Sequence, residues 1–198
     1  FKKFITKLPK DGFLVFNSDD KNLQKISFGK FSASAYSVKQ EEAKEIKGIM
    51  QIPGIHNVSN ALAVLAVARI LGINDEITFK TLGEYQGSWR RFEITKTKPY
   101  TVISDYGHHP NEVQATLQAA REKYPNQKIW CIFQPHQYQR TYYLLKDFIK
   151  VFRQLKIDQI IITDIYDVAG REEKNVSQKI SSEILAKNYE AEFQEMIG

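Results

Sequence analysis

Polar side chains gather in two short segments, each placed where an apolar run of the chain ends. Residues 105–110, with the sequence DYGHHP, follow one such run, and residues 134–141, with the sequence QPHQYQRT, follow another. If both runs are parallel strands, their carboxyl ends lie at the same edge of a sheet, where ligands of α/β proteins bind. The spacing therefore favours a binding site, although loops at strand ends are often polar for no functional reason.

Three histidines in these segments raise the question of a metal site. His108 and His109 are adjacent, and His136 lies in the second segment. Zinc is held by imidazole and thiolate groups in fixed geometry with supporting partners. Adjacent histidines on a tight turn usually point apart, and no fourth ligand is evident. A zinc-binding protein is thus an alternative, but we expect no metal held by these side chains.

A third segment, GIHNVSNA over residues 54–61, precedes and enters a helix predicted over residues 57–71. Asn57 at the helix start has the residue type of a simple N-cap. Asn60 lies one turn further and needs another explanation. Its amide can donate and accept at once, which suits the edge of an adenine base. The alternative is that Asn60 is only solvated.

Two arginines follow at what the composition indicates is a domain junction, residues 86–89. Arg90 and Arg91 belong to the sequence WRRFE. A guanidinium holds phosphate or carboxylate oxygens in a fork geometry and keeps its charge. The competing interpretation is an interdomain salt bridge with Glu93 or another carboxylate.

The elements that must position these residues fall into two groups on either side of the junction. Before it we expect helices over 1–8, 22–25, 57–71 and 76–83, a strand over 13–16, and two or three strands within 26–50. After it, strands over 100–105, 128–133 and 158–163 alternate with helices over 110–123, 141–154 and 177–187. This alternation predicts an α/β fold with a Rossmann-like parallel sheet covered on both faces.

Composition limits the classes of function and partner. The 198-residue chain carries a net charge of +5, but it has no basic stripe with interleaved aromatic residues, so we expect no nucleic-acid partner. No apolar run reaches transmembrane length and no signal peptide is seen, so we expect no membrane partner and a cytoplasmic protein. The single cysteine, Cys131, lies in an apolar run and is predicted to be a buried structural thiol. The absence of an initiator Met before Phe1 suggests an incomplete sequence.

These segments together resemble the Mur ligase family. Residues 54–61 resemble its signature at the end of the central ATPase domain, and residues 90–93 resemble the motif that opens its C-terminal domain. Residues 105–110, 133–136 and 140–141 are similar to the alanine-adding branch, and residues 8–20 fit the central domain of that branch. The resemblance implies that residues 1–87 are the C-terminal part of the central ATP-binding domain and that residues 88–198 are an incomplete C-terminal domain.

The resemblance also implies a reaction and a set of roles. Branch members use ATP and Mg²⁺ to join L-alanine to UDP-N-acetylmuramate through an acyl phosphate, in peptidoglycan synthesis. The implied roles are adenine binding by His56 and Asn60, phosphate contact by Arg91, ribose binding by Asp105, and alanine and acyl-phosphate binding by Tyr106, His108 and Arg140, of which His108 and Arg140 are catalytic. Asn57, His109 and His136 are expected to support the loops.

Three departures from the family pattern qualify this interpretation. Ser104 stands where the family commonly has Asp, and Gln137 stands where it often has Arg. The sequence also has no glycine-rich phosphate loop ending in Gly-Lys-Ser or Gly-Lys-Thr, so we expect these 198 residues to be inactive alone. A muropeptide-recycling ligase and a non-catalytic nucleotide-binding module remain as alternatives.

Overall fold

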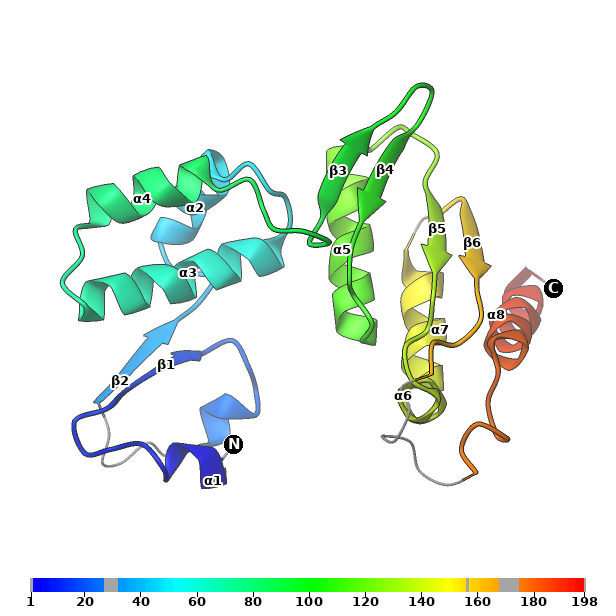
Figure 1. Ribbon diagram of the computed structural model, residues 1–198, viewed down its shortest axis with the longest axis horizontal. Coiled ribbons are helices and arrows are strands. Elements are labelled where there is room, and N and C mark those ends of the chain that lie inside the picture. Colours follow the sequence, from blue (N-terminus) through cyan, green and yellow to red (C-terminus); the bar gives the residue numbers. More distant parts are fainter. Residues whose placement is uncertain (1, 27–31, 156, 168–174, 198) are drawn as a thin grey trace. The chain divides into compact units, whose positions relative to one another are not determined.

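The computed structural model describes residues 2–26, 32–155, 157–167 and 175–197. The chain divides into two compact units, Phe1–Gly87 and Ser88–Gly198 (Figure 1). Within the described ranges, no helix is both long and apolar enough to cross a bilayer.

Unit 1 is a parallel pair of strands with helices packed beside it. Its elements are α1 (Lys2–Ile5), β1 (Phe13–Asn17), η1 (Leu23–Lys25), β2 (Ser32–Tyr36), α2 (Glu42–Ile49), α3 (Ile55–Ile70) and α4 (Asp75–Glu84). β1 pairs with β2 in parallel, with Phe13 opposite Ser32. Helix α3 contacts both strands and also packs against α2 and α4.

The core of unit 1 forms around α3. Val58, Ala61, Leu62 and Leu65 are buried at helical spacing, and they pack with Ile46 of α2 among others. The following helix, α4, begins after Asn74, whose side chain accepts a hydrogen bond from the backbone N–H of Glu76. Both helices confirm the elements predicted from the sequence, because their apolar periodicity and capping signals are strong.

Residues 26–50 differ from the prediction of two or three strands. The described part of this stretch holds one strand, β2, and one helix, α2, while residues 27–31 lie outside the described residues. In α2, Ala43 and Ile46 are buried three positions apart, and Glu42 and Glu45 lie in the first turn. Acidic residues there are stabilised by the helix dipole. The weak alternation of apolar and polar residues was therefore wrongly interpreted as strands, because the buried residues of this segment have the spacing of a helix.

One arginine joins α2, α3 and α4 of unit 1. The Arg69 guanidinium lies 2.7 Å from an Asp75 carboxylate oxygen and 2.8 Å from a Glu42 carboxylate oxygen. Arg69 is in the last turn of α3, Asp75 is in the first turn of α4, and Glu42 is in the first turn of α2. These ion pairs link the last turn of α3 to the first turn of the next helix, α4, and to the first turn of α2, where Glu42 lies 27 positions before Arg69.

Unit 2 contains a hairpin followed by two parallel strands. Its elements are β3 (Glu93–Lys96), β4 (Thr101–Ser104), α5 (Pro110–Lys123), β5 (Trp130–Phe133), α6 (Tyr138–Tyr143), α7 (Leu145–Gln154), β6 (Gln159–Ile162) and α8 (Ser182–Ile197). β3 and β4 pair antiparallel, and β5 and β6 pair in parallel. β4, β5 and β6 all end on the same side of the unit, where α5 and α6 begin (Figure 1).

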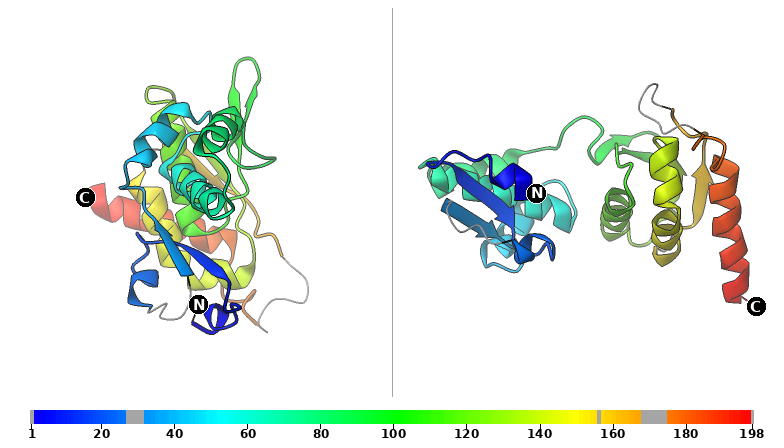
Figure 2. Two further views of the ribbon diagram at one scale, coloured as in Figure 1. Left: turned by 90° about the vertical axis from the view of Figure 1, so that its left-hand side faces the viewer. Right: turned by 90° about the horizontal axis from the view of Figure 1, so that it is seen from below.

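Helices α5 and α7 lie beside each other against the strands (Figure 2). Phe148 and Phe152 of α7 pack with Phe133 of β5 and with Leu185 of α8. On α5, Ala119 and Ala120 belong to a separate cluster with Phe92 that reaches the β3–β4 hairpin. This arrangement of helices and parallel strands confirms the predicted α/β class.

Three details of unit 2 correct the sequence prediction. The first strand is preceded by β3, an antiparallel partner that was not predicted. The helix predicted over 141–154 is two helices, because Leu144 leaves helical geometry at φ −108° and ψ 15°. The helix predicted to begin at Ser177 begins at Ser182.

The outward face of β5 also contradicts the expectation of a sheet covered on both faces. Trp130 is 66% exposed and Ile132 is 71% exposed, whereas Phe133 is buried. An unbroken apolar run shows that both faces of a strand are apolar, but it does not show that both are covered in this chain.

Candidate substrate site at the strand ends

The loop after β4 is held in place by the carboxylate of Asp105. One oxygen accepts a hydrogen bond from the Gly107 N–H at 2.7 Å, and the other accepts from the Phe92 N–H at 2.9 Å. Asp105 thereby joins this loop to the turn that begins the hairpin. A carboxylate has roughly four lone-pair sites, so these two bonds leave room for ribose hydroxyls. The structure gives Asp105 a positioning role that the sequence did not reveal.

A second carboxylate, that of Glu112, holds the next part of the same loop. One of its oxygens accepts from the N–H of His108 at 2.9 Å and from the N–H of His109 at 3.1 Å. Burial alone would raise the pKa of Glu112, but these two N–H groups, with His108 and Arg91 nearby, bring the pKa below its usual value. The His109 side chain accepts from the Asn111 N–H and completes a capping box at the start of α5.

His108 and Tyr106 are therefore presented on a loop with a fixed backbone. Nδ1 of His108 lies 2.9 Å from the carbonyl oxygen of Tyr106. A carbonyl can only accept, so this contact requires the proton on Nδ1 and leaves Nε2 as the acceptor nitrogen. The two rings meet nearly edge to face, with centroids 5.2 Å apart. In this tautomer His108 can take a proton from a substrate through Nε2.

The junction turn brings two guanidinium groups to the face of Tyr106. Cζ of Arg90 lies 4.8 Å from the centroid of the Tyr106 ring and 5.4 Å from that of Trp89, and Cζ of Arg91 lies 6.0 Å from that of Tyr106. The Tyr106 N–H also donates to the Arg90 carbonyl oxygen at 2.8 Å. The Glu93 carboxylate, considered above as a salt-bridge partner, instead accepts from the backbone N–H of Arg90.

The loop after β5 adds His136 and Arg140 to this cluster. The His136 ring centroid is 5.4 Å from that of His108 and 6.2 Å from that of Tyr106. Arg140 lies in α6, which begins after Gln137 at φ 73°. Its Nη1 is 3.3 Å from the His136 carbonyl oxygen and 3.4 Å from His136 Nδ1. Arg140 thus joins the cluster through His136.

The arginines of this cluster differ in their partners from the structural arginines. Arg69 and Arg121 form ion pairs with carboxylates, at 2.7 Å and 3.1 Å. Among the described residues, Arg90, Arg91 and Arg140 form no such pair; they lie on aromatic rings or beside an imidazole. Arg90 and Arg140 are thus oriented by uncharged groups, and Arg91 lies near the Glu112 carboxylate without a direct ion pair, so the cluster retains positive charge for an anionic ligand.

The other residues of the predicted site belong to unit 1. Asn60 is exposed in the second turn of α3, and His56 is half-buried in the first. Asn57 does not cap the helix as supposed: α3 begins after Gly54, and the Asn57 side chain donates to the Pro53 carbonyl oxygen at 2.6 Å. The structure therefore brings together Arg91, Asp105, Tyr106, His108 and Arg140 in unit 2, and it places His56 and Asn60 on one helix of unit 1.

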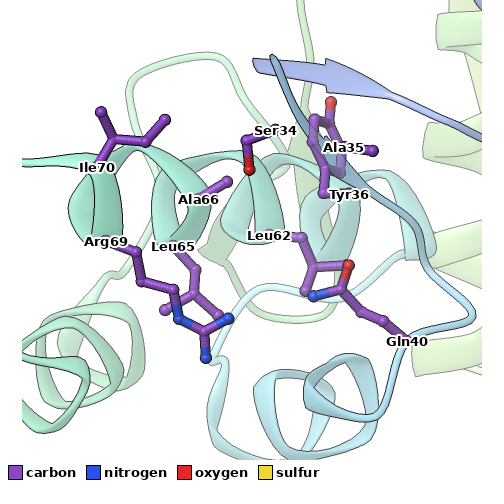
Figure 3. A pocket seen from close by; sticks show the side chains of 9 residues that line it. All are labelled: Ser34, Ala35, Tyr36, Gln40, Leu62, Leu65, Ala66, Arg69 and Ile70. Atoms are coloured by element: carbon purple, nitrogen blue, oxygen red, sulfur yellow. The ribbon is translucent and has the colours of Figure 1, made fainter. Parts of the chain in front are cut away.

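A pocket of about 260 Å³ in unit 1 is lined by none of these residues. It is lined by β2 and by the face of α3 that carries Leu62, Leu65 and Arg69 (Figure 3). Arg69 is the charged residue of its lining, and it is already paired with Glu42 and Asp75. The pocket therefore offers no free charge for a ligand.

The histidines do not form a metal cluster. In the described parts of the chain, no three His, Cys, Asp or Glu side chains are arranged to hold a metal ion. His109 is engaged in capping α5, so it does not converge with His108 and His136.

Two residues of the site were not predicted from the sequence. Glu112 was overlooked, although its place three residues after the cap is the capping-box spacing. Tyr166, which stacks on His136, was also overlooked and has no local signal.

Comparison with known proteins places the chain in a family. Residues 90–197 match the family model described as "Mur ligase, glutamate ligase domain". The chain belongs to the Mur ligase family. The matched residues include the loops that carry Arg91, Asp105, Tyr106, His108 and Arg140.

Several curated relatives of this chain have the same name. The UDP-N-acetylmuramate–L-alanine ligase of Alkaliphilus metalliredigens is 37% identical over 98% of the chain and 47% of its own length. The enzyme of the same name from Aquifex aeolicus is 38% identical over 98% of the chain and 46% of its own length. The chain spans about half the length of the curated relatives that it matches.

Solved Mur ligase structures share the fold. The UDP-N-acetylmuramate-alanine ligase of Thermotoga maritima has a TM-score of 0.52 and 32% identity, covering 70% of this chain and 28% of that one. MurF of Acinetobacter baumannii has a TM-score of 0.57 and 19% identity, covering 81% of this chain and 40% of that one. The second likeness is evidence of the fold alone.

Proposed function

We propose that the full-length protein is an ATP-dependent ligase that joins L-alanine to the carboxylate of UDP-N-acetylmuramate. The observation that carries the proposal is the cluster at the strand ends, where Arg90, Arg91 and Arg140 keep their charge around Tyr106 and His108. The printed names of the relatives support the choice of substrates. They also favour alanine addition over the muropeptide-recycling alternative.

The reaction has two steps in this proposal. A muramoyl carboxylate oxygen attacks the γ-phosphorus of ATP, which releases ADP and leaves an acyl phosphate. The alanine amine then attacks the acyl carbon, and phosphate leaves as the amide forms. Both steps build negative charge on oxygens, which positioned cations stabilise. Arg140 is proposed to hold the alanine carboxylate or the acyl phosphate, and Nε2 of His108 to accept a proton from the amine.

The nucleotide is assigned to a second set of residues. We assign adenine contact to His56 and Asn60, phosphate contact to Arg91, and ribose contact to Asp105. Their chemistry fits: Asn60 is exposed, Arg91 has no ion-pair partner among the described residues, and Asp105 retains lone pairs. Mg²⁺ would accompany the ATP phosphates, and no step above depends on a metal ligand from these residues.

Steady-state assays of the full-length enzyme test the proposal. Phosphate release should require ATP, UDP-N-acetylmuramate and L-alanine together, and omission of any one should reduce it to background. The 198-residue chain alone should show background release, because its sequence has no phosphate loop. Turnover that requires a different acceptor or amino acid would refute the proposed substrates. Turnover by the 198-residue chain alone would refute the expectation that the reaction needs a phosphate loop from outside these residues.

A further inference from the structure

The chain returns to the site after β6, at Tyr166. Tyr166 forms a parallel bridge with His136: its N–H donates to the Pro135 carbonyl oxygen at 2.8 Å, and its carbonyl accepts from the Gln137 N–H at 2.9 Å. These two bonds hold the residues on both sides of His136. They also hold Gln137 at φ 73°, a left-handed conformation that non-glycine residues rarely adopt without support.

The Tyr166 side chain adds a ring contact to the backbone bridge. Its ring stacks on the His136 imidazole with centroids 5.2 Å apart and an interplanar angle of 20°. The other rings near His136 meet it at steeper angles, 47° for His108 and 66° for Tyr106. Tyr166 therefore supplies the flat surface that fixes the plane of the imidazole.

The plane of the imidazole decides where Arg140 can bind. Nη1 of Arg140 contacts the carbonyl oxygen of His136 at 3.3 Å and Nδ1 of the same residue at 3.4 Å. Rotation of the ring would remove the second contact and leave the first. An arginine that has no carboxylate partner among the described residues depends on such contacts for its direction.

We infer that Tyr166 is a positioning residue of the substrate site: its ring holds the His136 imidazole, and through it the Arg140 guanidinium. The identity of the ligand that Arg140 binds rests on the proposed function, whereas the contact between the Tyr166 and His136 rings does not. The ring is 54% exposed, and the argument assigns no task to its hydroxyl. A phenylalanine ring should therefore replace it, whereas an aliphatic side chain of similar volume should not.

Kinetics of two variants of the full-length enzyme test the role of the ring. Tyr166→Leu should raise the KM for alanine about two- to tenfold, the range expected for loss of one aromatic pair. Tyr166→Phe should stay within about twofold of the wild type, and the KM for ATP should be unchanged in both variants. Tyr100→Leu is the matched control, because Tyr100 is 72% exposed and precedes β4, at the opposite end from Asp105.

A spectroscopic measurement tests the contact without ligase activity. The Tyr166 ring should shift the NMR signals of the stacked His136 ring protons, which a His136→Gln spectrum assigns. This shift should disappear in Tyr166→Leu and persist in Tyr166→Phe and Tyr100→Leu. Circular dichroism confirms that each variant is folded.

The outcomes separate the inference from the proposed function. Alanine-independent turnover by the wild type would refute the function, while the NMR comparison would still decide the contact. An unchanged alanine KM or an unchanged His136 signal in Tyr166→Leu would overturn the inference. Equal losses in the Leu and Phe variants would assign the role to the hydroxyl and overturn it as well, as would equal losses for alanine and ATP.

Discussion

Replacing Gly107 with alanine tests whether the Asp105 carboxylate holds the loop after β4. A side-chain carbon at Gly107 would lie 2.9 Å from Oδ1 of Asp105, closer than real Cβ atoms approach an oxygen. The same oxygen accepts the Gly107 N–H at 2.7 Å. Alanine therefore enters only if the carboxylate shifts, which weakens this bond and strains the bond of the other carboxylate oxygen to the Phe92 N–H.

The magnitude follows from the weakening of the hydrogen bond between the Gly107 N–H and the Asp105 carboxylate. A hydrogen bond to a charged group contributes about 1.5–3 kcal/mol to stability, and partial exposure of Asp105 reduces that value. We expect Gly107→Ala to lower the free energy of unfolding of unit 2 by about 1–2 kcal/mol. Gly48→Ala is the matched control, since no heavy atom lies within 4 Å of the added carbon in α2. It should leave the unfolding of unit 2 unchanged, because Gly48 lies in unit 1.

Urea unfolding followed by tryptophan fluorescence measures the effect in unit 2, because both tryptophans of the chain, Trp89 and Trp130, lie there. A double-mutant cycle with Asp105→Ala adds the decisive comparison. Without the carboxylate, alanine at position 107 has nothing to displace, so the double variant should be about as stable as Asp105→Ala. Additive losses, or wild-type stability for Gly107→Ala, would refute the reasoning.

Three further predictions concern the substrate site, the ion pairs of unit 1 and the cysteine. Arg140→Lys in the full-length enzyme should lower kcat/KM for alanine about tenfold or more, because Lys loses the second parallel hydrogen bond; steady-state kinetics at saturating ATP measure this, and a wild-type value would leave only a structural role. Folding lowers the pKa of Glu42, through its own backbone N–H and then Arg69, and the pKa of Asp75, through Arg69. The stability that these two carboxylates contribute is present at neutral pH and is lost as the pH falls below their usual pKa values of 4.5 and 3.8. Thermal melts should therefore show a larger decrease of Tm on acidification in the wild type than in Arg69→Met. Burial raises the pKa of Cys131 to about 11, so mass spectrometry should show slow alkylation by iodoacetamide at pH 8 in the folded chain and fast alkylation in urea; equal rates would contradict this.

The sequence predicted the elements whose signals are local. Helix α3 has continuous apolar periodicity, α4 follows the Asn74 cap, and α5 begins at Pro110. The two polar loops were also predicted correctly at strand ends, since one follows β4 and the other follows β5. These features depend on residues within a few positions of one another, so a pattern can show them.

The parts that failed depend on contacts between distant residues. Helix α2 was mistaken for strands because eight residues carry little periodicity. The antiparallel strand β3 is defined by its partner β4 and not by its own four residues. Likewise, the Asp105 carboxylate reaches the Phe92 N–H thirteen positions away, and Tyr166 meets His136 only because β6 lies beside β5. Candidate site residues could thus be proposed from residue type, spacing and the family resemblance, whereas the residues that position them could not.

The partners of the arginines distinguish two roles that look alike in the sequence. Arg90 is three residues from Glu93, and a salt bridge between them was a reasonable expectation. The positive φ of Arg90, 54°, belongs to a turn in which the Glu93 carboxylate accepts the backbone N–H of Arg90. The guanidinium is left on the face of Tyr106, which orients it but does not neutralise it.

Arg140 shows the same arrangement on the second loop, where an imidazole and a carbonyl replace a carboxylate. By contrast, Arg69 forms ion pairs with Asp75 and Glu42, and Arg121 forms one with Asp158. These pairs join elements of the fold. A guanidinium directed by neutral partners retains its attraction for an incoming anion. Two such loops on one side of unit 2 are therefore suited to bind oxyanion groups, which is consistent with the acyl phosphate of the proposed reaction.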